Sequence, residues 1–298
     1  MPRNSNPYQP DTDSSMDEFV STHETTIRLA AFFGVFLAMA AWEVLAPRRS
    51  LTQPKGSRWL NNITLVVLNT LLLRLLFPTA AVGVAALCNE RQWGLFNQVD
   101  IPDILAVVAT VVILDGLIYL QHVMFHAVPA LWRLHRVHHA DLDFDVTTGA
   151  RFHPIEIILS MLIKFAAIVL LGPPLLAVVI FEVVLNATSM FNHGNVRLPL
   201  WLDRYLRLFI VTPDMHRVHH SHLEHETNSN FGFSLSLWDR LLGTYRAQPE
   251  DGHTGMTIGI DTWRDAAHCV RLPGLLLQPF SGKVIDYAIN RRSWKQPQ

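Results

Sequence analysis

Five long apolar stretches constrain what this chain can fold into. They cover residues 27–46, 60–88, 101–120, 155–171 and 175–190, and a helix that spans a bilayer needs about 20 such residues. Only 16% of the 298 residues are charged, against about 25% in soluble domains, which disfavours an ordinary cytosolic enzyme. The last two stretches are short and meet at Gly172-Pro173-Pro174, so they could form a hairpin that does not fully cross. The sequence predicts an all-α, polytopic membrane protein with four to five transmembrane helices.

Charged residues beside the spans predict the orientation. Residues 1–26 carry five acids and one base without the basic start of a signal peptide, so we expect a flexible N-terminal tail. Loop 47–59 holds four basic residues and no acid, whereas loop 89–100 has a net charge of −1. Because short cytoplasmic loops are rich in Lys and Arg, loop 47–59 is predicted to be cytoplasmic and the N-terminus to lie outside. Everything after the third span then faces the cytoplasm.

Histidine is concentrated after the third span. Residues 122–139 and residues 216–225 each contain five of the fifteen histidines, and His193 lies between these clusters. The spacings are His-x3-His, His-x2-His-His and a second His-x2-His-His, which place imidazoles on one face of a helix. Imidazole suits Zn, Cu, Fe and Ni. One His-x3-His is more often structural than not, but three clusters on one side of a membrane predict a metal site, and nine clustered histidines exceed what one ion accepts. His23, His253 and His268 are isolated and are predicted to lie on the surface.

Polar residues near these clusters have predicted supporting roles. Asp115, Tyr119, His122 and His126 follow one stripe of the third span. Because a metal-bound histidine usually donates its other N–H to a carboxylate, Asp115 is predicted to orient a histidine of a later cluster, or to act through Tyr119 and water. Across the hairpin turn we expect an ion pair between Lys164 and Glu182, and we expect the amphipathic segment 197–211 to lie in the membrane interface.

These residues resemble the fatty acid hydroxylase/sterol desaturase superfamily of membrane di-iron oxygenases, of the bacterial type. The matching segments are PALWRLHRVHH (129–139), TTGARFHPIE (147–156), FNHGN (191–195) and HRVHHSHLEHETNSNFGFSLSLWDRLLGTY (216–245), over roughly residues 100–280. By this resemblance the metal ligands are His122, His126, His135, His138, His139, His193, His216, His219 and His220.

The chain departs from the family at two positions. Val123 stands where many members carry Arg, which changes charge near the site without removing a ligand. Ser189 stands where some members have a further ligand, so water or Asn192 could take that place. His153 is expected to support the site rather than to bind metal, and Glu156 is expected to act in the same way.

The resemblance implies O2-dependent hydroxylation or desaturation of a lipid by two iron ions. We expect residues 1–26 to be the tail, 27–120 the transmembrane helices and 121–298 the catalytic region, including the 155–190 hairpin, with one catalytic domain overall. The catalytic region would form a histidine-rich helical cap on the cytoplasmic side of the membrane. No haem-binding domain, Gly-rich dinucleotide motif or iron–sulfur cysteines are evident, so a separate electron donor is expected (a cytochrome, ferredoxin or reductase). The net charge of −1 gives no reason to expect nucleic acid as a partner.

Other function classes fit the sequence less well. The alternative is a membrane metal-binding protein or transporter without oxygenase activity, but a transporter would place ligands across the middle of the bilayer. A haem cytochrome would use single facing histidines, and a zinc hydrolase would use His-Glu-x-x-His, which is absent. The sequence leaves sterols, fatty acyl chains, ether lipids, carotenoids and aminolipids open as substrates.

Overall fold

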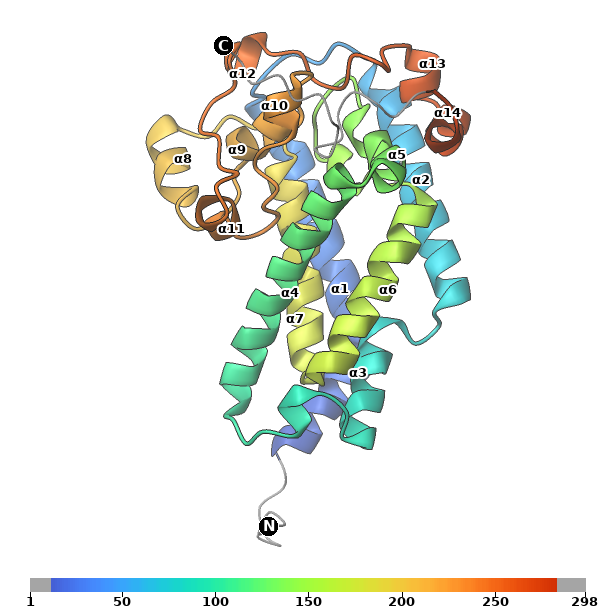
Figure 1. Ribbon diagram of the computed structural model, residues 1–298, viewed down its shortest axis with the longest axis vertical. Coiled ribbons are helices and arrows are strands. Elements are labelled where there is room, and N and C mark those ends of the chain that lie inside the picture. The colour runs from blue at the N-terminus through green and yellow to red at the C-terminus, as the bar shows by residue number, and fades with distance from the viewer. Residues whose placement is uncertain (1–11, 283–298) are drawn as a thin grey trace, which may run out of the picture.

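The structure, a computed structural model, describes residues 12–282. All regular secondary structure in this range is helical, and β-pairing is limited to isolated bridges. Long helices form an elongated bundle, and short helices gather at one end of it as a cap (Figure 1). This arrangement confirms the predicted all-α fold.

The bundle has the properties of a membrane domain. Five segments of the described chain are long and apolar enough to span a bilayer. Large apolar side chains on their outer surfaces are exposed, for example Leu45 (83%), Leu75 (77%) and Leu170 (73%). Such surfaces suit lipid rather than water, so the predicted number of spans is confirmed. The bundle helices are α1 (Thr12–Leu45), α2 (Lys55–Leu76), α3 (Ala80–Arg91), α4 (Asp103–Ala127), α6 (Pro154–Leu171) and α7 (Leu175–Asn192).

Helix α1 begins before the predicted first span. Residues 12–26, which were expected to be a tail, are helical from Thr12 onward. The sequence has no Gly or Pro between Thr12 and Phe33, and extending an existing helix is much easier than starting a new one. The apolar span therefore continues into its polar N-terminal segment as one helix. Residues 1–11 of the predicted tail lie outside the described residues.

The second predicted span consists of two helices. Stretch 60–88 was expected to be one span, but α2 ends at Leu76 and α3 starts at Ala80, with Pro78 between them. Proline lacks a backbone N–H and clashes with the preceding turn, and Ala80 has a positive φ of 50°. The chain is therefore not helical between Leu76 and Ala80, and α2 and α3 together cover the length of this span.

Helices α6 and α7 form a hairpin whose turn lies at the end of the bundle opposite the cap (Figure 1). Gly172 has a φ of +59°, and a Cβ there would lie 2.1 Å from the carbonyl oxygen of Trp93. The Asn97 side-chain amide donates to the Gly172 carbonyl oxygen at 3.2 Å. Lys164 Nζ lies 2.8 Å from Glu182 Oε1, which confirms the predicted ion pair. The hairpin thus extends from the cap to the connection between α3 and α4.

The cap is built from short elements. They are α5 (Pro129–His139), α8 (Leu200–Leu206), α9 (Pro213–His219), α10 (Glu224–Thr227), α11 (Leu237–Leu241), α12 (Gly252–Gly255), α13 (Ala266–Cys269) and α14 (Leu272–Leu277), with single 3-10 turns at η2 (Thr148–Ala150) and η3 (Gln278–Phe280). A further 3-10 turn, η1 (Leu95–Asn97), lies at the opposite end of the bundle.

Buried ion pairs join the cap to the bundle. Arg58, in the first turn of α2, is fully buried and donates to Asp141 (2.8 Å) and Asp145 (2.6 Å) in the segment after α5. Burial alone would raise the pKa of Asp141, but Arg58 and Arg151 lower it to about 2. Arg48 donates to Asp214 of α9 at 3.0 Å. Two of the four basic residues of loop 47–59, Arg48 and Arg58, therefore pair with acids of the cap. The cytoplasmic orientation remains a prediction.

Segment 197–211 is less regular than expected. Only Leu200–Leu206 is helical, and Trp201, Tyr205 and Phe209 are exposed as predicted for an interfacial surface. Arg207 of the same segment is buried and pairs with Asp203 rather than facing lipid headgroups. The membrane-interface position of this segment stays a prediction.

Candidate metal centre

The structure brings the nine predicted histidines together in two adjacent groups. In each group, one nitrogen of every ring lies within 4.8 Å of the others, and all nine side chains are buried. The five-histidine group comprises His122, His126, His135, His139 and His219, and the four-histidine group comprises His138, His193, His216 and His220.

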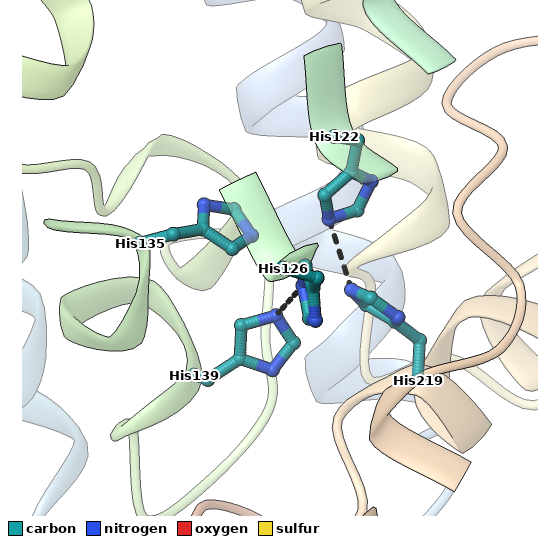
Figure 2. Close-up of side chains that lie close together, drawn as sticks. All are labelled: His122, His126, His135, His139 and His219. Atoms are coloured by element: carbon teal, nitrogen blue, oxygen red, sulfur yellow. Dashed lines mark hydrogen bonds between the residues drawn. The ribbon is translucent and has the colours of Figure 1, made fainter. Parts of the chain in front are cut away.

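The side chains of the five-histidine group come from α4, α5 and α9, and Figure 2 shows them side by side. Helix α4 contributes His122 and His126, which are four residues apart. The Nε2 atoms of His122 and His219 are 3.0 Å apart, and those of His126 and His139 are 3.1 Å apart. Ring nitrogens of neutral imidazoles at this spacing point toward a common centre.

The four-histidine group is centred on His193, directly after α7. Its Nε2 lies 3.1 Å from His138 Nε2 and 3.0 Å from His216 Nε2. His220 stacks on His139 of the other group, with ring centroids 4.6 Å apart. The two groups are therefore in direct contact through stacked imidazole rings.

Each His-x2-His-His motif divides its rings between the groups, although we expected each motif to present its three imidazoles together. His135 and His139 belong to one group, while His138 belongs to the other. The second motif repeats the division with the groups exchanged, since His216 and His220 are separated from His219. At 3.6 residues per turn, positions i and i+4 lie on one side of a helix and i+3 is offset from them.

Backbone and side-chain oxygens fix the orientation of several rings. The Nδ1–H of His122 donates to the Phe231 carbonyl oxygen (2.8 Å), and that of His219 donates to the Ser229 carbonyl oxygen (2.7 Å). His193 donates in the same way to the Ser189 carbonyl oxygen at 2.8 Å. Because a carbonyl oxygen can only accept, the proton is on Nδ1 and the lone pair on Nε2 faces the centre of each group.

Within residues 12–282, one carboxylate contacts the nine histidines. Glu156 Oε1 lies 2.6 Å from Nδ1 of His135, and both side chains are buried. We expected Glu156 to support the site without knowing its partner. It lies in the first turn of α6, so the fold rather than sequence spacing creates this contact.

Asp115 does not have the predicted role. Its carboxylate accepts from the backbone N–H groups of Ser234 and Leu235, both at 3.2 Å, and from the Trp238 indole at 2.9 Å. These donors occupy the carboxylate that was expected to orient a histidine. Asp115 thus ties α4 to the segment before α11 and contacts neither histidine group. No local pattern indicates these contacts, because the donors lie more than a hundred residues away from Asp115 in the chain.

The other predicted supporting residues also bond elsewhere. The Tyr119 hydroxyl pairs with Thr244 Oγ1 at 2.9 Å. His153 caps α6 by accepting from the N–H of Ile155 at 3.2 Å. The Asn192 amide donates to the Phe233 carbonyl oxygen at 2.7 Å, so none of the three has a hydrogen bond to the nine histidines among the described residues.

Of the isolated histidines, His23 and His268 are exposed as predicted. The prediction for His253 is wrong: its side chain is buried, and its Nε2 lies 3.6 Å from Asp214. Burial lowers the pKa of His253 to about 4. This residue therefore packs inside the cap, beside α9.

The histidine groups are electrostatically suited to cations. Burial lowers the pKa of His135 and of His193 to about 3, and it lowers the pKa of His138, His139 and His216 well below 6.5. Neutral imidazole is the form that ligates metals. His220 has both nitrogens buried without a hydrogen-bond partner among the described residues, and such a group costs free energy unless a ligand takes its lone pair.

The fatty acid hydroxylase family model matches residues 107–244. All nine histidines lie within this range. Over this segment the chain is similar to the fatty acid hydroxylase family, which supports the resemblance to the fatty acid hydroxylase/sterol desaturase superfamily. The family resemblance found in the sequence is thereby confirmed, and the two histidine groups are part of the fatty acid hydroxylase domain.

Several curated proteins are similar to this fatty acid hydroxylase domain. Ornithine lipid hydroxylase OlsE of Rhizobium tropici is 32% identical over 61% of this chain and 54% of its own length. Human alkylglycerol monooxygenase is 27% identical over 49% of this chain and 32% of its own. Fatty acid hydroxylase vlmA of Lecanicillium is 26% identical over 55% of this chain and 47% of its own. The chain thus spans from about a third to about half of these relatives, and no solved structure matches it.

Proposed function

We propose that this protein is an O2-dependent di-iron oxidoreductase that hydroxylates or desaturates a lipid at the membrane. The observation that carries the proposal is the pair of adjoining, buried, all-histidine groups. In this proposal the five-histidine group holds one iron and the four-histidine group holds the other. In this proposal the catalytic region comprises residues 121–298, including the 155–190 hairpin, and residues 27–120 are the transmembrane helices.

The residues present fit two such ions. Each group offers at least four nitrogen ligands within 4.8 Å of one another, and imidazole is a good ligand for iron. The buried Nε2 atoms of His135 and His220 lack hydrogen-bond partners among the described residues, as expected of atoms that ligate a metal. A bound pair of ferrous ions would supply the reduction of O2 and the oxidation of an unactivated C–H bond.

The chain's own residues orient the ligands and exclude water. Phe231 packs its ring against His126 (5.0 Å between centroids) and its carbonyl oxygen holds the Nδ1 proton of His122. Glu156 holds the Nδ1 proton of His135, which makes that imidazole a stronger electron donor toward a metal. A buried, preorganised ligand set of this kind protects a reactive centre from solvent.

A lipid substrate is supported by two independent observations. The similar proteins are named for an ornithine lipid, an alkylglycerol and a fatty acid. The site also lies at the cap end of apolar helices, where a membrane lipid can reach it (Figure 1). We further propose that the cap faces the cytoplasm and that electrons come from a separate cytochrome, ferredoxin or reductase.

The test is to purify the protein in detergent and measure metal content, the absorption spectrum and O2 uptake with a chemical reductant. We expect two irons per chain, no haem Soret band and reductant-dependent O2 uptake. Comparing the lipids of expressing and non-expressing cells should reveal products heavier by one oxygen atom or lighter by two hydrogen atoms. Bound metal without O2 uptake or a lipid product would favour the metal-binding or transport alternative.

A further inference from the structure

A cavity of about 530 Å3 lies between α1, α2, α6 and α7, below the cap. On α1 it is lined by Thr25 and by the residues 3, 4, 7, 8 and 11 positions further along. On α2 it is lined by Ile63 and by residues at the same five steps. Such a series is a single stripe of an α-helix, so two continuous helix faces form this cavity, which we call the α1–α2 groove.

The α1–α2 groove is open on the lipid side of the bundle. Helix α1 packs mainly against α7, and α2 packs against α6, so the two groove-lining helices are held apart. Phe33 of α1 and Val67 of α2 line the groove and are also exposed at its rim. Both helices belong to segments able to span a membrane, and the groove therefore opens sideways toward hydrocarbon.

The upper end of the groove lies next to the four-histidine group. Val146, Ala150 and Met190 line this end. Gly149, beside Ala150, separates it from His193, because a Cβ on Gly149 would lie 3.0 Å from His193 Nδ1. One glycine therefore stands between the groove and a predicted metal ligand.

Charged residues line only the lower end of the groove. Arg28 and Arg74 lie there, and Arg28 Nη1 is 3.2 Å from Glu182. Asn62, at the upper end, is twelve positions before Arg74 in α2, a distance of about 18 Å along the helix. The groove is thus an apolar passage that runs from beneath the histidines to a charged floor.

The dimensions of the groove select its occupant. The groove encloses about 530 Å3 and is about 18 Å long, which is enough for one extended hydrocarbon chain. Its rim at Phe33 and Val67 opens toward the hydrocarbon of the bilayer, which supplies such chains.

We propose that the α1–α2 groove binds one acyl or alkyl chain of the lipid substrate, which enters sideways between α1 and α2. The carbon to be oxidised lies at the upper end, beside Gly149, and the chain end points toward Arg28 and Arg74. This inference rests on the proposed function for the identity of the lipid as substrate. The polar part of the lipid stays near the cap, because the groove lining from Ile63 to Leu71 is apolar except for Thr70, whose hydroxyl donates to the Val66 carbonyl oxygen.

The test uses photo-crosslinking of the full chain in phosphatidylcholine vesicles. One phosphatidylcholine probe carries a diazirine at the end of an acyl chain, and a second carries it next to the ester. Mass spectrometry maps the adducts, and metal content and lipid oxidation are measured on the same samples. Val66→Trp fills the groove from α2. If this variant does not accumulate in cells, Val67→Trp at the rim of the groove replaces it. Leu68→Trp, on the same helix but outside the groove lining, is the matched control.

We expect chain-end adducts near Leu29 and Leu71 and ester-side adducts near Ala150 and Met190. Val66→Trp should lower both by about tenfold or more while metal content stays unchanged, and Leu68→Trp should leave them unchanged. Adducts that do not respond to Val66→Trp overturn the inference, as does the reversed pattern, which would place a headgroup at Arg74. Crosslinks between two copies of the chain would also overturn it. If the groove forms adducts but the protein binds no metal, the proposed function is refuted and lipid binding in the groove stands. If the enzyme is active but the groove forms no adducts, only lipid binding in the groove is refuted.

Discussion

In the five-histidine group, four of the five rings donate their Nδ1–H to a neighbouring oxygen: to Phe231, Asn228, Glu156 and Ser229. In the four-histidine group, only His193 does so, and the buried Nδ1 atoms of His138, His216 and His220 have no hydrogen-bond partner among the described residues. Outer hydrogen bonds fix the ring orientation and raise the basicity of metal-ligating histidines. The first group is therefore held rigidly before metal binds, while the second depends on packing.

The two groups also differ in their surroundings. The five-histidine group is enclosed by segment 228–231 and by Glu156, and so it carries a carboxylate. The four-histidine group lies beside Gly149 and the end of the α1–α2 groove. Under the proposed function, we infer that the anchored group would mainly retain its metal and that the less constrained group would adjust its ligands next to the substrate.

The largest expected effect is the loss of one ligand from each group. His216→Ala leaves three nitrogen ligands in the four-histidine group, and His219→Ala leaves four in the five-histidine group. Both variants should lose turnover, because in the proposed function both metals take part in O2 reduction. His216→Ala should lose the ion of its own group, whereas His219→Ala should keep its ion with weaker affinity. Metal analysis after dialysis against a chelator measures the difference.

His268→Ala, which changes an exposed histidine, is the control and should retain all metal and turnover. Equal metal loss in His216→Ala and His219→Ala would mean that the groups do not differ in rigidity. Full turnover by either variant would contradict the ligand assignment itself.

Acid should destabilise the metal-free protein, with the histidine groups as the cause. Burial lowers the pKa of His135 and His193 from 6.5 to about 3. Below pH 6.5 these histidines bind protons in the unfolded chain but stay neutral in the folded chain. The free energy of unfolding is therefore highest above this pH and decreases as the pH drops toward 3. The melting temperature of the metal-free protein should therefore decrease between about pH 6.5 and about pH 5.

An exposed histidine again gives the control for this pH dependence. His23→Gln should reproduce the same curve of melting temperature against pH, whereas His135→Gln should flatten it by removing one titrating group. A metal-free protein whose melting temperature does not change in this pH range would show that the imidazoles are hydrated rather than buried.

A smaller effect is expected for the carboxylate that distinguishes the two groups. Glu156→Gln keeps a hydrogen-bond acceptor for Nδ1 of His135 but removes the negative charge. Changes at such outer contacts cost about 10–100-fold in activity or metal affinity, so we expect turnover to fall within this range while both metals remain bound. The spectroscopic signature of one iron should shift and that of the other should not. A shift of both signals, or unchanged turnover, would argue against a role confined to the five-histidine group.

The sequence predicted what depends on local periodicity. Apolar length fixed the spans, and His-x3-His placed His122 and His126 on one face of α4. The division of His138 from His139 between two groups depends on where α7 and α9 pack, which no local pattern contains. Glu156 was placed near the site only by resemblance, and its partner His135 is 21 residues away.

Long-range partners explain why Asp115 was predicted wrongly. Asp115 was predicted to orient a histidine, because it lies four residues before Tyr119 on the same helix face as His122 and His126. Its actual donors belong to the loop before α11 and to Trp238. Periodicity gives the face on which a side chain lies, but it does not give the tertiary partner that packs there.

The smallest effect on chemistry is therefore expected for Asp115→Asn, although this carboxylate is as deeply buried as Glu156. The asparagine amide keeps one acceptor oxygen. Its NH2 group, however, points toward N–H donors that bond to the carboxylate in the unmodified protein. Losing hydrogen bonds to a buried charged group costs about 1–3 kcal/mol, so the melting temperature should fall while metal content and turnover per bound metal pair stay unchanged. Trp238→Phe, which removes a single donor, should destabilise less. A loss of turnover in folded, metal-loaded Asp115→Asn comparable to that of Glu156→Gln would mean that α4 transmits the state of this carboxylate to His122. Glu156, which contacts the histidines, and Asp115, which holds α4 against the segment before α11, would then not differ in their effect on turnover.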